Sequence, residues 1–198
     1  MAAGEARRRT VRGACALGGA WAAVVLADVA LVRTHVLAGA YTGISALAGA
    51  FAGALLLEVG IGRAEEAAVE VRDGRSLLSA RTLTGVRTVD LDALAGVRRC
   101  EEALRGRHDE FRLRDRHGVR LAVPNGPSVD AALRRALGTA PDVRVTRHAR
   151  TTLGLTPRSR VPAGLHAFWG TQMFVGAMAV PALLGHTVAC LLAGTNVF

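Results

Sequence analysis

Three apolar stretches of membrane-spanning length constrain this chain more than any other feature of its sequence. They run from Gly13 to Val32, from Val36 to Ile61 and from about Leu165 to Leu192. A transmembrane helix needs about 20 mostly apolar residues to cross about 30 Å of hydrocarbon. Only residues 33–35 separate the first two stretches, so these two should form an antiparallel helical hairpin. The sequence therefore predicts an integral membrane protein with three transmembrane helices.

The first apolar stretch could also be a cleaved signal peptide, because four arginines precede it. Its apolar run is longer than the core of a usual signal peptide, however. The first Ala-x-Ala pattern after this stretch, at residues 38–40, lies beyond Arg33 and inside the next apolar stretch. We therefore expect the first stretch to remain as a membrane helix that inserts together with the second.

The arginines around these stretches indicate which side of the membrane each loop faces, because positively charged loops stay in the cytoplasm. The turn between the first two stretches has only Arg33, and the tail after Leu192 has no arginine. We predict a multi-pass plasma-membrane protein with a cytoplasmic N-terminus and central domain and an external C-terminus. The arginines at the cytoplasmic ends of the stretches are Arg7, Arg8, Arg9, Arg12, Arg63, Arg158 and Arg160.

This topology divides the chain into four parts. These are a basic cytoplasmic N-terminus (1–12), a transmembrane hairpin (13–62), a cytoplasmic domain with linkers (63–162), and a last transmembrane helix with a short external tail (163–198). The third part has room for a single globular domain, which excludes a large multidomain enzyme. It carries 20 arginines and 13 acidic residues, a net charge of +7.

Residues 63–162 show a pattern of short strands followed by one amphipathic helix. Between Asp109 and Arg114, Phe and Leu alternate with Arg, as in a half-buried antiparallel strand. Ser128 is expected to cap the helix and Gly138 to end it. Another β-like stretch, Val143 to Thr146, follows. The candidate strands are Ala68 to Arg72, Ser76 to Leu83, Val86 to Leu91, Val97 to Cys100, Asp109 to Arg114 and Val119 to Val123.

The central region also resembles a known family. The resemblance rests on RTLTGVRTVDLDALAGVRR (Arg81 to Arg99), FRLRDRHGVRLAV (Phe111 to Val123) and the helix at Ser128 to Leu137. These segments are similar to actinobacterial membrane proteins whose central part is similar to a bacterial pleckstrin-homology-like (PH-like) domain. The resemblance implies an α+β membrane protein, with an antiparallel PH-like β-barrel or meander, capped by one helix, inserted before the last transmembrane helix. Its motifs are structural, so they imply a fold and no reaction.

Small residues form a stripe along the second apolar stretch, where they allow another helix backbone to approach closely. Gly49 and Gly53 form one GxxxG pair on this surface. The stripe fits packing within the chain, against the first and third helices, and it also fits a homodimer through the second helix. Its members are Gly39, Gly43, Ala46, Ala50, Gly53 and Gly60.

Polar residues within the apolar stretches are candidates for function, since they are costly in lipid. Asp28, Glu58 and His186 are the principal ones. No two charged groups converge near the middle of the membrane, so local anchoring is favoured over an ion path. We expect Asp28 to interact with Arg33, His35 or Tyr41.

No catalytic residue, metal site or cofactor is predicted. Cys100, His108 and His117 match no familiar ligand spacing, and Cys15 and Cys190 form no CxxC motif with them. Phe111 is the only aromatic residue of the domain, so nucleic-acid binding by base stacking is not expected.

The sequence favours a non-enzymatic, membrane-anchored protein with a scaffold or regulatory role, whose PH-like module contacts protein partners or anionic lipid. The flanking arginines are the candidate lipid contacts, because each arginine near an anionic leaflet contributes about 1 kcal/mol of attraction. Topological retention in the cytoplasm explains the same arginines equally well. The alternative is a small accessory subunit of a transporter or secretion complex.

Overall fold

The computed structural model describes residues 3–36, 43–102, 108–140, 142–157 and 162–194. Within these residues the fold is α+β, with five helices and two β-sheets. The chain separates into two compact units. The sheet unit comprises Met1–Thr10 and Val59–Thr171, and the helical unit comprises Val11–Glu58 and Gln172–Phe198. The prediction of an α+β chain is confirmed.

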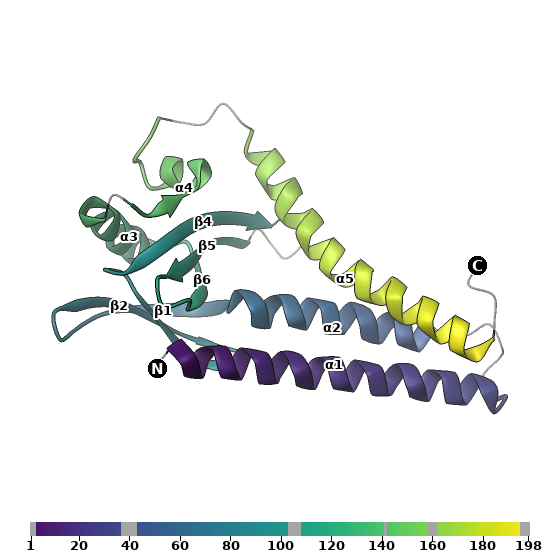
Figure 1. The fold of residues 1–198 in the computed structure, drawn as a ribbon. Helices are drawn as coiled ribbons and strands as arrows, with labels where there is room; N and C mark the ends of the chain where they lie inside the picture. The colour runs from purple at the N-terminus through teal and green to yellow at the C-terminus, as the bar shows by residue number, and fades with distance from the viewer. Residues whose placement is uncertain (1–2, 37–42, 103–107, 141, 158–161, 195–198) are drawn as a thin grey trace. The chain divides into compact units, whose positions relative to one another are not determined.

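Three long helices supply the candidate membrane spans: α1 (Ala3–Arg33), α2 (Gly43–Ile61) and α5 (Ala163–Ala193) (Figure 1). Each is long and apolar enough to cross a membrane. The prediction of three such helices is confirmed. α1 begins well before the first apolar stretch, because its arginine-rich first turns contain neither glycine nor proline between residues 5 and 12 to interrupt the helix.

Within the helical unit, α2 and α5 approach closely at Gly49 and Gly53. A Cβ atom at Gly49 would overlap the backbone of Pro181, and one at Gly53 would overlap the carbonyl oxygen of Ala177. Pro181 lies inside α5 and has no N–H to donate to Ala177, four residues earlier. The carbonyl oxygen of Ala177, which lacks its helical donor because of Pro181, therefore faces Gly53 of α2.

The predicted stripe of small residues is only partly used in this contact. Gly53 is buried, and the middle members Gly43, Ala46 and Ala50 are half-buried. Gly60 is exposed, with no heavy atom within 4 Å of where its Cβ would lie. Gly39 lies outside the described residues.

Charged side chains in the helical unit bind helix ends. Asp28 is 1% exposed and accepts hydrogen bonds from the backbone N (2.9 Å) and the hydroxyl (2.5 Å) of Ser45, in the first turn of α2. Arg33 donates to the carbonyl oxygen of Leu192 (2.6 Å), in the last turn of α5. A carboxylate at a helix N-terminus and a cation at a C-terminus are both electrostatically favourable. Of the predicted partners of Asp28, neither Arg33 nor His35 bonds to it among the described residues, and Tyr41 lies outside them.

The sheet unit contains two separate sheets. β1 (Ala64–Arg72), β2 (Arg75–Thr82) and β3 (Gly85–Asp90) form an antiparallel meander. The second sheet has the order β6-β5-β4-β7, made of β4 (Leu94–Glu102), β5 (His108–Asp115), β6 (Arg120–Pro124) and β7 (Arg144–Val145). β7 runs parallel to β4, and the other pairs are antiparallel. Strands that meander are thus confirmed, but the sheets do not close into the expected barrel.

One hydrophobic core fills the sheet unit, and two short helices complete it: α3 (Pro127–Thr139) and α4 (Arg147–Thr152) (Figure 1). The inward positions of the alternating strands are buried, as the pattern around Phe111 predicted. The predicted cap at Ser128 is wrong, since Gly126 is the N-cap and makes no side-chain bond. Pro127 starts the helix instead, because its fixed φ suits the first helical position.

Candidate functional site

Arg87 is buried at the centre of a hydrogen-bond network that we call the Arg87 network. The residue is 3% exposed. Its Nη2 donates to the carbonyl oxygen of Val59 (2.8 Å) and to the hydroxyls of Thr84 (2.8 Å) and Thr10 (3.0 Å). Its Nη1 donates to the carbonyl oxygen of Arg120 (3.0 Å). The network therefore joins β3, the β2–β3 turn and the start of β6 to α1 and α2.

No carboxylate pairs with Arg87 among the described residues, so its charge needs another source of stabilisation. Val59 lies in the last turn of α2, where carbonyl groups have no helical donor and the helix dipole is negative. Arg87 thus caps α2. Burial lowers the pKa of the Arg87 guanidinium from its ordinary value, but an arginine remains charged throughout the physiological range.

Local sequence explains why Arg87 points inward. β3 alternates, so that Arg87 and Val89 are buried while Val86 is exposed. Gly62 follows α2 with a φ of +70°, and a Cβ there would overlap the Arg87 guanidinium. Sequence reasoning did not identify Arg87. The available signal was an arginine in phase with the buried Val89.

The β2–β3 turn is rigid and lies beside the N-terminal helix. The hydroxyl of Thr82 donates to the carbonyl oxygen of Gly85 (2.8 Å) and accepts from the backbone N of Thr84 (3.3 Å). Gly85 has a φ of +105°, which only glycine adopts readily. A Cβ on Gly85 would lie 2.8 Å from Nη1 of Arg9. The turn therefore reaches the arginine-rich start of α1.

Apolar and basic side chains are exposed together on this turn, which we call the β2–β3 tip (residues 81–86). Leu83 is 67% and Val86 51% exposed. Arg81 pairs across the strands with Val86 and is also exposed. The tip thus presents two large apolar side chains bordered by arginines.

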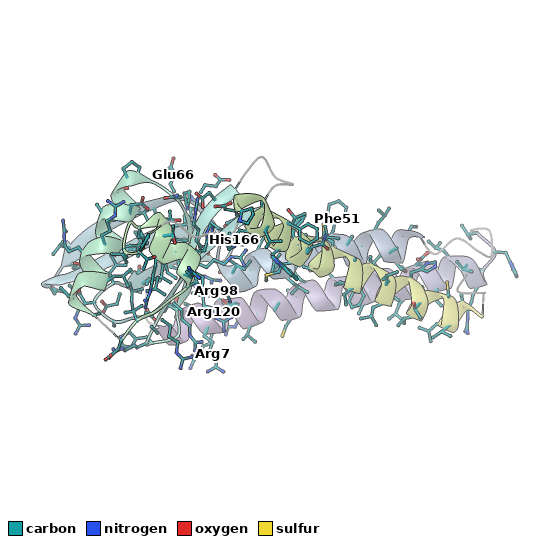
Figure 2. The ribbon with its side chains drawn as sticks, turned by 90° about the horizontal axis from the view of Figure 1, so that it is seen from above. Arg7, Phe51, Glu66, Arg98, Arg120 and His166 are labelled. Carbon is teal, nitrogen blue, oxygen red and sulfur yellow. The ribbon has the colours of Figure 1, made fainter. Side chains whose placement is uncertain are left out.

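The predicted lipid-contact arginines have different environments. Arg7, Arg8, Arg9 and Arg12 are exposed on α1, and Arg7 extends away from the first turns of the helix (Figure 2). Arg9 also pairs with Glu5 (2.5 Å). The Arg63 side chain is only 15% exposed and makes two bonds to the Glu110 carboxylate, at 2.7 and 3.2 Å. Arg63 therefore belongs to a half-buried ion pair within the sheet unit. Arg158 and Arg160 lie outside the described residues.

A second polar cluster surrounds Arg99 on β4. Arg99 makes two bonds to the Asp109 carboxylate, at 2.7 and 2.6 Å, and one to the hydroxyl of Thr152 (2.6 Å). It also pairs with Glu101 (2.9 Å). Burial raises the pKa of Asp109, but the hydrogen bonds from Arg99 and Asn125 outweigh it, and the pKa is lowered. The cluster fastens α4 to the sheet.

Two histidines extend this cluster to the first turns of α5. Nε2 of His148 lies 3.0 Å from a carboxylate oxygen of Glu101, and the His148 ring stacks on that of His166 with centroids 3.9 Å apart. His166 lies near the start of α5 (Figure 2). Burial, followed by the charges of His166 and Arg99, lowers the pKa of His148 although Glu101 opposes the shift. Neutral His148 is therefore the form that the folded unit favours.

Acidification is expected to loosen α4. Because the folded state lowers the pKa of His148, the unfolded state binds more protons near its ordinary value of about 6.5. The resulting stability is complete above that pH and is lost as pH falls below it. The protection factors of residues 147–153 in the full chain, which correct for the intrinsic pH dependence of amide exchange, should therefore fall between about pH 7 and pH 5. His148→Gln should remove this pH dependence, whereas the same change at the exposed His117 should leave it intact.

The structure groups no metal-binding cluster in the part of the chain that it describes. No set of three or more His, Cys, Asp or Glu side chains is placed there to hold a metal ion. His117, one of the histidines considered from the sequence, is exposed in the β5–β6 turn. The described polar clusters instead consist of ion pairs and hydrogen bonds between secondary-structure elements.

Comparisons of the chain with protein-family models, curated proteins and solved structures find no match. The similarity of residues 66–150 to a PH-like domain therefore stays a prediction. The same holds for the predicted protein and lipid partners.

Proposed function

We propose that this chain is a non-enzymatic, membrane-anchored interaction protein with a scaffold or regulatory role, which holds a cytoplasmic PH-like module against the inner leaflet. The observation that carries the proposal is the Arg87 network. Within the sheet unit it bonds β3 to Thr10, three residues before the first apolar stretch, and to Val59, at the end of α2. Thr10 lies in the arginine-rich part of α1, and Val59 lies in the last turn of α2. Because the chain continues from both residues directly into apolar helix, we infer that the β2–β3 tip lies close to the membrane surface.

Charge supports anionic lipid as one binding partner of this module. Arg7, Arg8 and Arg9 are exposed, Arg9 lies beside the tip, and the positive-inside rule predicts that all three face the cytoplasm. The inner leaflet carries anionic lipid, and attraction falls off within a Debye length of about 8 Å at physiological salt. These arginines are therefore close enough to the headgroups to bind them, and the rest of the module's surface is left for protein partners.

The expected result is protection of the basic surface by anionic lipid. The full chain would be placed in nanodiscs of phosphatidylcholine, with or without phosphatidylglycerol, and amide exchange of residues 3–12 and 81–86 compared at low and high salt. Exchange should slow in the anionic discs, and salt should weaken the effect.

The matched pair of variants separates position from total charge. Arg7→Gln, Arg8→Gln and Arg9→Gln together should abolish the lipid-dependent protection. The combination Arg72→Gln, Arg116→Gln and Arg135→Gln removes three other exposed arginines and should preserve it. Equal exchange in both kinds of disc would refute lipid binding by this surface.

A further inference from the structure

The β2–β3 tip has a composition that its position explains. Exposed leucine and valine side chains at a turn leave apolar surface in contact with water, which is unfavourable. Together with bordering arginines, the same side chains are favourable at a bilayer surface, where apolar side chains enter below the headgroups and cations contact phosphates. Leu83 and Val86 supply the apolar part, and Arg81 and Arg9 supply the cationic part.

The hydrogen bonds that hold the turn are the second observation. The Thr82 hydroxyl donates to the carbonyl oxygen of Gly85 and accepts from the backbone N of Thr84. Arg87 donates to the Thr84 hydroxyl through Nε (3.3 Å) and Nη2 (2.8 Å). Through Nη2 the same guanidinium is bonded to Thr10 and Val59. A turn fixed in this way loses little conformational entropy when it enters a lipid interface.

We propose that the β2–β3 tip is a membrane-inserting wedge, with Leu83 and Val86 in the interfacial layer of the leaflet and Arg81 and Arg9 on lipid phosphates. This inference rests on the proposed function and deepens it, because it assigns one loop to the lipid surface. Its occupant is the bilayer in which the chain itself is anchored. Two observations favour this occupant. Arg87 bonds the tip to Thr10, in the arginine-rich part of α1, and to Val59, in the last turn of α2, and Arg9 and Arg81 lie beside the tip.

The chain provides a matched control at the other end of the same sheet. Val71 is 72% exposed and lies beside the β1–β2 turn, where it pairs with Ser76. β2 runs eight residues from the β1–β2 turn to the tip. At about 3.3 Å per residue the two turns lie roughly 25 Å apart, well beyond the depth of the interfacial layer. If exposure alone decided lipid contact, Val71 and Leu83 would contact lipid equally. A membrane-inserting tip predicts that Leu83 contacts lipid and Val71 does not.

Tryptophan fluorescence in the full-length protein tests the proposal. Trp21 and Trp169 would be replaced by Phe, and single tryptophans introduced as Leu83→Trp, Val86→Trp or Val71→Trp. Each protein would be reconstituted in nanodiscs containing anionic lipid, with acyl chains brominated close to the glycerol backbone or left unbrominated. Tryptophan at 83 and 86 should emit at shorter wavelength and lose most of its emission to the brominated lipid. Tryptophan at 71 should show neither effect.

The outcomes separate this inference from the proposed function. Quenching at 83 and 86 but not at 71 supports the wedge. Absence of quenching at both tip positions overturns it, and lipid-dependent protection of residues 3–12 would then show that the arginines bind lipid without insertion. Equal quenching at 71 also overturns it, because the label would then report nonspecific contact. Two tip positions are used so that a folding defect in one variant leaves the other decisive.

Discussion

Arg87→Met is expected to lower the free energy of unfolding of the sheet unit by about 3 kcal/mol. The substitution removes the guanidinium group, which donates hydrogen bonds to the carbonyl oxygens of Val59 and Arg120. A hydrogen bond from a charged donor contributes about 1.5–3 kcal/mol, and a buried acceptor left without a partner adds a desolvation penalty. Relief of a buried charge offsets part of the loss, which keeps the expected value below the sum of these contributions.

Amide exchange of the buried strands β4 and β5 measures this effect in the intact membrane protein, because their slowest amides report unfolding of the unit. Arg75→Met is the matched control, since Arg75 lies on the adjacent strand β2 but is exposed. It should change the free energy by less than about 0.5 kcal/mol. Equal changes in the free energy of unfolding in both variants would show that Arg87 contributes no more to stability than an exposed arginine does.

Gly53→Ala should disrupt the packing of α2 against α5 and destabilise the helical unit by about 2–3 kcal/mol. The added methyl group would overlap the backbone carbonyl of Ala177, so one helix must shift. Overpacking of this kind costs about 1–3 kcal/mol, and loss of the close backbone approach removes the main attraction between helices in lipid. Thermal unfolding in mild detergent should show a lower midpoint.

Gly60→Ala is the control for this substitution, because Gly60 belongs to the same predicted stripe but has open space around it. Its unfolding midpoint should be unchanged or slightly higher, since alanine favours helix by up to about 1 kcal/mol. A similar loss in both variants would mean that glycine acts through helix flexibility and not through contact with α5.

Sequence patterns predicted the elements that depend on local periodicity. The long apolar stretches became α1, α2 and α5, and alternation around Phe111 correctly identified β5 and its buried face. All six candidate strands have counterparts, and the β-like stretch after α3 became β7. These features were predictable because hydrophobic periodicity acts within a few residues of the chain.

The parts that were not predictable depend on partners far away in the sequence. Asp28 was expected to interact with Arg33, His35 or Tyr41, and the bond to Ser45 at the start of α2, 17 residues away, was not foreseen. The sequence did not indicate that Arg87 lies at the centre of a hydrogen-bond network, because its acceptors include Thr10, 77 residues away. The parallel pairing of β7 with β4, which leaves two open sheets, likewise requires contacts that no local pattern encodes.

The Arg87 network also bears on the order in which the chain is synthesised. Thr10 and Val59 leave the ribosome before Arg87, so the two helix ends that it bonds are already made when β3 emerges. Arg120 follows and completes the set. A fragment excised at residue 63 would lack the first two acceptors and expose a guanidinium that the intact chain buries. Folding of the sheet unit is therefore coupled to the first turns of α1 and to the end of α2, which precede it in the chain.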